Sequence, residues 1–249
     1  RSGKYSFFTE HMPFEFESDE HFLKDLSGSD VEPIAQLPSG DDGHHHHHHH
    51  GHGSLDPHVW HDPNNIIKMT NLISKNLKKD ISFFNREERR SINNKANEAK
   101  SILEDLNDWI INQVSTIPMS NRIIVSKHKA LDYYGSAFGF ETISLLDTLG
   151  ESSSLRPSNI SSVLAELEED NVKVLFPEQK PVSKLLKNLS RQSSIPLADD
   201  VIFVDGLMMK GNTISVAVHN TCNIVNSLGG ICNRDLGENL ENKWNILIN

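Results

Sequence analysis

Four side chains of types that bind metal ions stand out in this sequence, although they lie far apart in the chain. They are two histidines and two acidic residues: His58, His128, Glu178 and Asp205. Neutral imidazole and carboxylate groups are common protein ligands of zinc and neighbouring divalent cations. Taken singly, each is more typical of a satisfied polar residue, a turn or a helix cap. Their convergence at one edge of a predicted sheet, described below, indicates a shared metal site.

A histidine-rich tract precedes His58. His44 to His50 and His52 lie between an acidic stretch at residues 40–43 and the sequence DPHVWHDP at residues 56–63. A flexible polyimidazole tract is a weak, multivalent metal trap, whereas the histidine behind it lies where a tight site could form. Affinity tags usually sit at a terminus, so the internal position favours a native loop over a tag.

Bulk composition excludes some classes of protein. The net charge of −10 argues against a nucleic-acid partner, which requires clustered Lys and Arg. No apolar run approaches the ~20 residues needed to span a bilayer. Residues 39–54 contain only Gly, Asp, His and Ser, so we expect them to be disordered without metal. Cys222 and Cys232 could be one disulfide or two buried thiols, and we favour the disulfide.

The first half of the chain is predicted to be mostly helical. Residues 4–8 are typical of a short strand, residues 20–26 of a helix, and residues 31–37 of a further apolar element. Asp62 followed by Pro63 predicts the start of a helix. A single apolar stripe over residues 86–115 predicts a helix of ~30 residues, about 45 Å long. We interpret it as a rigid rod that joins two lobes.

After Pro118 the pattern alternates between strands and helices. Strands are predicted at 122–126, 140–145, 172–176 and 201–204, and helices at 130–137, 157–168, 181–189 and, last, 214–228. This alternation is typical of a mostly parallel sheet with helices on both faces. Ligands bind at the loops after the carboxyl ends of such strands, where His128, Glu178 and Asp205 lie.

These motifs together resemble a known family. In order along the chain they are MPFE at 12–15, the histidine-rich loop with DPHVWHDP at 56–63, SKHKA at 126–130, FPE at 176–178 and VDGL at 204–207. In this order the chain resembles the solute-binding proteins of ABC-type zinc and manganese importers, the zinc-uptake branch in particular. The resemblance covers nearly the whole chain.

The resemblance implies an α/β, two-lobed solute-binding protein with a long linking helix. We expect the first lobe to be incomplete, because the family's first ~80 residues have no counterpart here. The expected division is residues 1–85 with the histidine-rich loop, residues 86–117 as the linking helix, and residues 118–249 as the second lobe. Such a protein is a periplasmic or otherwise extracytoplasmic monomer, free or lipid-anchored. It captures one divalent metal ion between its lobes and delivers it to an ABC permease.

The resemblance also implies roles for individual residues. His58, His128 and Asp205 match ligand positions of the family. Glu178 matches a position that is a direct ligand in manganese-type members and a nearby carboxylate in zinc-type members. A further histidine ligand, in a Pro-His motif, has no counterpart here. His61 replaces an apolar residue, and at i+3 from His58 it could add a ligand or lie exposed.

Alternatives remain open at the level of sequence. Two or more imidazoles with one carboxylate favour zinc, whereas direct coordination by Glu178 would favour manganese. A metal-assisted hydrolase would use Glu178 as a general base and a water at the open zinc vertex. The sequence has no HExxH pair, so we expect a protein that is not an enzyme. A metal buffer or chaperone would act through the histidine-rich loop alone.

Overall fold

The computed structural model describes residues 56–79, 84–145, 157–208 and 211–248. The chain divides into two compact units, Arg1–Pro57 and His58–Asn249, and nearly all described residues belong to the second. The elements predicted before residue 39 and the histidine-rich loop lie outside the described residues. Among the described helices, none is both long enough and apolar enough to cross a bilayer.

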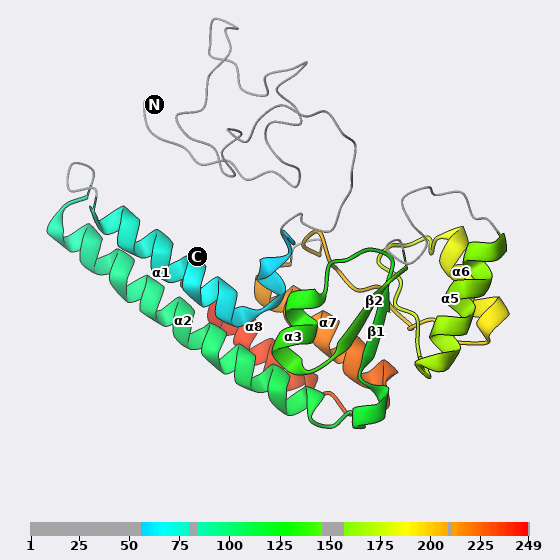
Figure 1. Ribbon diagram of the computed structural model, residues 1–249. Helices are drawn as coiled ribbons and strands as arrows, with labels where there is room; N and C mark the ends of the chain where they lie inside the picture. Colours follow the sequence, from blue (N-terminus) through cyan, green and yellow to red (C-terminus); the bar gives the residue numbers. More distant parts are fainter. Residues whose placement is uncertain (1–55, 80–83, 146–156, 209–210, 249) are drawn as a thin grey trace, which may run out of the picture. The chain divides into compact units, whose positions relative to one another are not determined.

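Helices α1 (Pro63–Lys79) and α2 (Arg86–Val114) run side by side as an antiparallel hairpin (Figure 1). The predicted cap of α1 is confirmed, because the carboxylate of Asp62 accepts a hydrogen bond from the Asn64 amide at 2.9 Å. The start of α2 is fixed by a reciprocal capping box between Asn85 and Glu88. The long helix is therefore where the apolar stripe predicted it.

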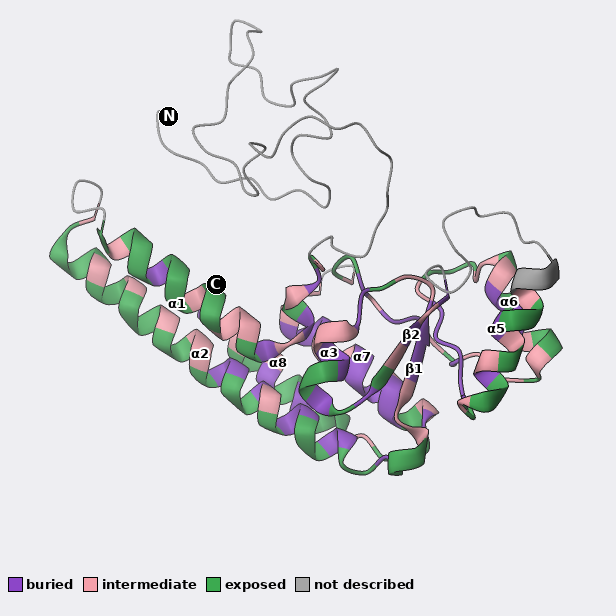
Figure 2. Ribbon diagram, viewed as in Figure 1, coloured by how far each residue is buried: buried purple, intermediate pink, exposed green. Residues whose placement is uncertain are grey.

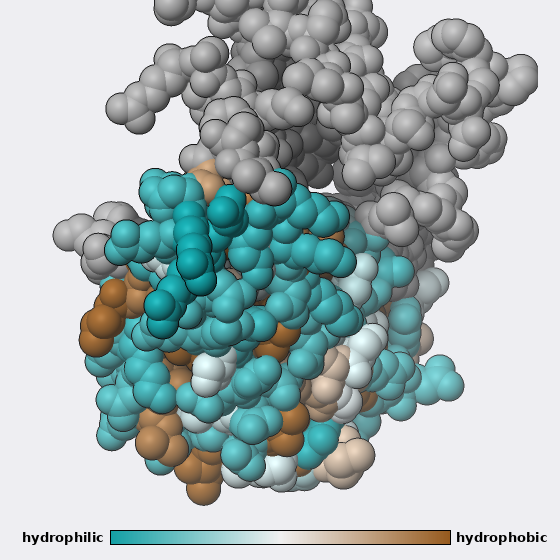
Figure 3. Space-filling model, turned by 90° about the vertical axis from the view of Figure 1, so that its left-hand side faces the viewer, coloured by the Kyte–Doolittle hydropathy of each residue, from teal (hydrophilic) through white to brown (hydrophobic). Residues whose placement is uncertain are grey.

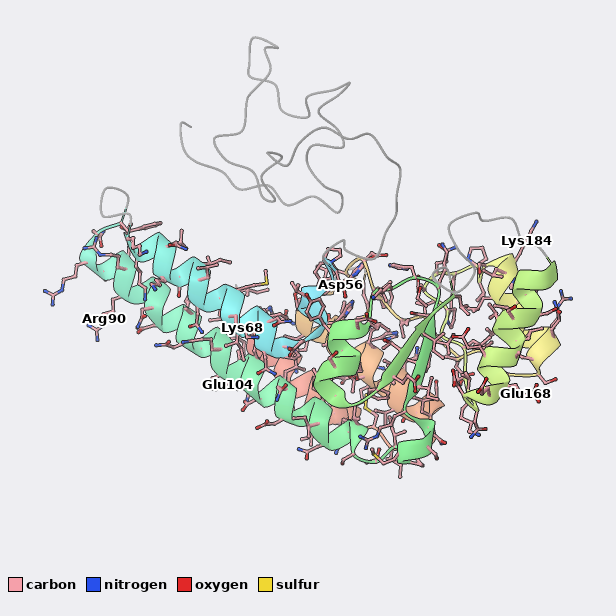
Figure 4. All side chains as sticks on the ribbon, viewed as in Figure 1. Asp56, Lys68, Arg90, Glu104, Glu168 and Lys184 are labelled. Carbon is pink, nitrogen blue, oxygen red and sulfur yellow. A yellow bond between two sulfur atoms is a disulfide. The ribbon has the colours of Figure 1, made fainter. Side chains whose placement is uncertain are left out.

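The apolar stripe of α2 is buried mainly in its second half, at Leu103, Leu106, Ile110 and Val114. Figure 2 shows this burial increasing toward the end of the helix, where α7 (Thr213–Ser227) and α8 (Arg234–Ile248) pack against it. In Figure 4 the labelled side chains of Lys68, Arg90 and Glu104 lie on the outside of the hairpin. Hydrophilic residues dominate the end-on face of the described hairpin in Figure 3.

Two strands of the predicted parallel sheet are confirmed. β1 (Ile123–Ser126) pairs with β2 (Glu141–Ser144) in parallel, with Ile123 opposite Glu141 and Ser126 opposite Ser144. Helix α3 (Asp132–Phe138) connects the two strands. The strand predicted at 172–176 is reduced to Leu175, which forms parallel bridges with Val125 and Leu197.

The strand predicted at 201–204 is wrong, because this segment makes one backbone hydrogen bond to Pro177 and its other contacts are with side chains. The amide of Ile202 donates to the carbonyl of Pro177 at 2.8 Å. Asn220 on α7 binds both the amide and the carbonyl of Phe203, at 2.8 and 2.7 Å. His219 on α7 donates from Nε2 to the carbonyl of Val201 at 2.9 Å. The backbone polar groups are thus satisfied without a strand ladder.

The other helices follow the sequence closely, with two corrections. Helices α5 (Pro157–Glu169) and α7 lie where they were predicted. Helix α6 (Lys184–Ser193) begins three residues later than predicted, because the Ser183 hydroxyl caps it by accepting from the Leu186 amide. Helix α8 was not predicted. It packs on α2 and α7, and a disulfide between Cys222 and Cys232 joins α7 to the segment before it, as favoured from the sequence.

Two apolar clusters support these elements. The larger lies among α2, α3, α7 and α8, and the smaller lies between the β1–β2 pair and helices α5 and α6. Both clusters lie within the second compact unit. The predicted domain boundaries at residues 86 and 117 stay a prediction.

Candidate metal centre

His58 is placed by a short helical turn. It directly precedes the 3-10 helix η2 (Val59–His61), and the amide of His61 donates to its carbonyl at 3.3 Å. The His58 side chain is buried, and its ring lies edge-on to that of Trp60, with 5.4 Å between the ring centroids. The turn therefore holds one imidazole in a fixed place at the start of the second unit.

His128 is placed by the end of β1 and by Glu178. The Ser126 hydroxyl donates to the carbonyl of His128 at 3.0 Å. Glu178 Oε1 accepts from the amides of Lys127 and His128 at 2.6 and 3.3 Å. Glu178 Oε2 lies 2.8 Å from Nδ1 of His128. A histidine that donates its Nδ1–H to a carboxylate has a free lone pair on Nε2 with which it can bind a metal ion. A carboxylate is a common hydrogen-bond partner of metal-binding histidines.

Asp205 lies between the two imidazoles. Its Oδ1 is 3.0 Å from Nε2 of His58, and its Oδ2 is 3.3 Å from Nε2 of His128. The two histidine rings have centroids 5.5 Å apart. Each residue offers one ligand atom, and these three atoms all lie within 4.8 Å of one another. The structure thus brings together the three residues expected as ligands.

Glu178 is close to this group but does not belong to it. Its two oxygens are occupied by His128 and by two backbone amides. It therefore orients the imidazole of His128 and is not one of the three residues whose ligand atoms lie within 4.8 Å of one another.

The arrangement is suited to a divalent cation. With zinc–ligand bonds of about 2.0–2.1 Å, ligand atoms around a tetrahedral ion are about 3.3 Å apart. Oδ1 of Asp205 lies 3.0 Å from the His58 imidazole and Oδ2 lies 3.3 Å from the His128 imidazole, while one ligand atom from each residue lies within 4.8 Å of the others. Three donors on one side of an ion leave further coordination positions open.

The electrostatics of the site favour a positive charge. The pKa of His128 is raised above its ordinary value of 6.5, first by the hydrogen bond with Glu178 and then by the negative charges of Glu178 and Asp205. Burial acts in the opposite direction and lowers it. A cation between the side chains would supply the charge that a proton supplies on His128.

His61 was expected either to add a metal ligand or to lie exposed, and the structure shows a different arrangement. Its side chain is buried, and its Nε2 donates to the carbonyl of Val204 at 3.0 Å. Within the described residues, the group that could hold a metal ion consists of His58, His128 and Asp205, without His61. The sequence placed His61 near the site but gave no sign of this backbone contact.

Comparison with known proteins identifies the family. Residues 7–227 match the family described as zinc-uptake complex component A, periplasmic. The chain belongs to this family. Membership of the zinc-uptake component A family confirms the resemblance seen in the sequence.

Curated relatives of the chain are named for manganese or for an unspecified metal. The chain is 29% identical over 181 residues to the manganese-binding lipoprotein MntA of Halalkalibacterium halodurans, covering 70% of this chain and 57% of that protein. It is 25% identical over 200 residues to the metal-binding protein YtgA of Chlamydia pneumoniae, covering 72% and 58%. The chain therefore spans less than two thirds of the length of these relatives.

Solved structures show the same fold. Fe(III)-bound YtgA from Chlamydia trachomatis has a TM-score of 0.61 at 22% identity and covers 73% of this chain and 66% of that chain. The periplasmic zinc-binding protein TroA from Treponema pallidum has a TM-score of 0.59 at 20% identity and covers 70% and 66%. The expected α/β fold of the two-lobed type is thus confirmed.

Proposed function

We propose that this protein captures a divalent cation, zinc foremost, at His58, His128 and Asp205 and delivers it to an ABC permease. The observation that carries the proposal is the gathering of three ligand atoms within 4.8 Å. Two of these residues, His58 and Asp205, are 147 positions apart in the chain. Such a contact between distant polar residues, in a family of metal-uptake components, favours a built site over a chance cluster.

Zinc is favoured over manganese by the way Glu178 is used. Manganese prefers oxygen ligands, whereas two imidazoles with one carboxylate suit zinc. Glu178 would be the added oxygen donor, but its oxygens bind His128 and backbone amides. A cation at the three ligands would therefore meet two nitrogens and the carboxylate of Asp205. Relatives named for manganese make that metal the alternative cargo.

The histidine-rich loop provides the competing function of a metal buffer. The test is elemental analysis and competitive zinc titration on the full chain and on a loop variant, in which His44 to His50 and His52 are replaced by asparagine. We expect the loop variant to lose several weak ions and to keep one tightly bound ion. Loss of nearly all metal binding in the loop variant would instead support the buffer function and overturn the site at His58, His128 and Asp205.

Substitution at the site completes the test. His58→Ala in the loop variant should abolish the remaining tight ion. The matched control is His219→Ala, which removes an imidazole that binds the Val201 carbonyl away from the three ligands. Tight binding that survives His58→Ala would overturn the assignment, and manganese bound more tightly than zinc would overturn the choice of metal alone.

The wider architecture belongs to the same proposal. From the resemblance seen in the sequence, we propose a division into residues 1–85, 86–117 and 118–249, action as a monomer and delivery to a permease. The chain covers 57% of the length of MntA, so we limit the ligand assignment to the three residues in the second unit of this chain.

A further inference from the structure

We propose that His61 is a positioning residue that fixes Asp205 for cation binding and so sets the affinity and geometry of the site. The inference rests on the proposed function, because it assigns His61 a role only if a cation binds at His58, His128 and Asp205. His61 reaches the site through another residue and would not itself touch the ion.

The first support is a pair of contacts from one turn. His58 lies immediately before η2 and His61 is its last residue. His58 contacts the carboxylate of Asp205 at 3.0 Å, while His61 contacts the carbonyl of Val204, the residue before Asp205, also at 3.0 Å. One turn therefore holds both the side chain and the backbone of the acidic ligand.

The chemistry of the second contact fixes the role of the ring. A carbonyl oxygen can only accept a hydrogen bond, so Nε2 of His61 carries the proton and donates it. That nitrogen then has no lone pair to offer a cation. The buried ring serves as a hydrogen-bond donor to the backbone.

The second support is the unusual way in which the Asp205 segment is held. Residues 201–203 are attached to α7 through His219 and Asn220. The carbonyl of Val204, in contrast, is bound by His61 from η2. The peptide that leads into Asp205 is thus tied to the same turn as His58, in addition to the attachment of residues 201–203 to α7.

The third support is the space beside this contact. His61 and Asp205 both line a cavity of about 220 Å³, together with apolar residues such as Leu106 and Ile110. Most of the wall is apolar, and the Asn220 amide that also lines it already donates to the Phe203 carbonyl. Loss of the imidazole would therefore leave the Val204 carbonyl to move or to bind water. Asp205 would then lose its fixed position.

The experiment compares three single variants in the full chain whose loop histidines, His44 to His50 and His52, are replaced by asparagine. His61→Leu fills the volume but cannot donate. His61→Gln restores a nitrogen that can donate to the same carbonyl. His219→Leu is the control, since it removes the same kind of imidazole–carbonyl contact at Val201. The readouts are zinc affinity by chelator competition, the visible spectrum of bound Co²⁺, and the thermal midpoint without metal.

We expect His61→Leu to weaken zinc binding about 10- to 100-fold, the usual effect of losing a residue that orients a metal ligand. Its Co²⁺ spectrum should also differ from that of the parent. His61→Gln should recover the parent spectrum and most of the affinity. His219→Leu should lower the thermal midpoint but leave the spectrum and the affinity unchanged, because it acts only on the fold.

Parent-like affinity and spectrum in His61→Leu would overturn the inference, as would equal losses in the Leu and Gln variants. Should the Leu variant not fold, His61→Asn replaces it, because its shorter amide falls short of the Val204 carbonyl. Asn weaker than Gln would then support the inference, and equality would overturn it. Failure of the parent itself to bind Zn²⁺ or Co²⁺ would overturn the proposed function instead.

Discussion

Glu178 holds His128 by both its ring and its backbone. One carboxylate oxygen lies 2.8 Å from Nδ1, and the other accepts from the His128 amide at 3.3 Å. The same second oxygen accepts from the amide of Lys127 at 2.6 Å. The loop after β1 and the imidazole are therefore oriented by a single side chain that lies 50 residues further along the chain.

Replacing Glu178 by Gln should lower zinc affinity about 10- to 100-fold, because the ring of His128 loses its negatively charged partner. Competition with a coloured chelator measures the change. The control is Glu168→Gln, an exposed acidic residue on α5, labelled in Figure 4. Equal affinities for the two variants would show that Glu178 does not support the site.

Zinc binding should weaken as the pH falls through the pKa of His128. The hydrogen bond with Glu178, aided by nearby negative charge, raises this pKa above 6.5 in the metal-free protein. Zinc requires the neutral imidazole, so protons compete with it at higher pH than they would for an ordinary histidine. Affinities measured from pH 8 to pH 5.5 test this, and constant affinity over that range would contradict it.

The stability of the metal-free protein should respond in the opposite sense. A pKa that is raised in the folded state means that protonation of His128 favours folding. This contribution is fully present below the unfolded value near 6.5 and is lost as the pH rises through the raised folded value. NMR titration of the His128 ring should place its midpoint above 6.5 in the parent and lower in Glu178→Gln.

Asn220→Ala should destabilise the protein by about 2–4 kcal/mol, since it leaves the part-buried amide and carbonyl of Phe203 without their side-chain partner. Urea unfolding measures the loss. The control, Asn93→Ala, removes an exposed contact with Lys78 between α1 and α2 and should cost less than about 0.5 kcal/mol. Similar costs at both sites would refute this account of the 201–204 segment.

Gly237→Val should loosen the packing of α8. A Cβ at this position would lie 2.7 Å from Cγ1 of Val218 and 2.9 Å from Cζ2 of Trp109. Overpacking of this kind costs about 1–3 kcal/mol. Asn239→Val, at an exposed position of the same helix, provides the matched control. Thermal unfolding should separate the two variants, and equal midpoints would argue against a close contact between α8 and α7.

Residues with strong local signals were placed well from the sequence. The stripe ending in Leu106, Ile110 and Val114 predicted α2, because one face of a helix packs against the core. The positions after the strand segments at β1 and Leu175 located His128 and Glu178, whereas Asp205 lies beside His128 although the strand predicted before it does not form. These signals depend on spacing within one segment and on the general behaviour of parallel sheets.

Features that depend on contacts between residues far apart in the chain could not be predicted from local sequence patterns. Residues 201–204 have the composition of a strand, but Asn220 and His219 from α7 occupy their backbone groups. Helix α8 has apolar residues at helical spacing, at Leu236, Leu240 and Trp244, and the glycine at 237 obscures the pattern. His61 could be assigned only after its turn was seen beside Val204.

The disulfide between Cys222 and Cys232 bears on the compartment in which folding of the protein is completed. It closes the connection between α7 and α8, and α8 otherwise rests on noncovalent packing. Thiols in a reducing cytoplasm stay unpaired, whereas oxidising surroundings outside it allow them to join. The last helix is therefore secured only after the polypeptide has left the compartment of its synthesis.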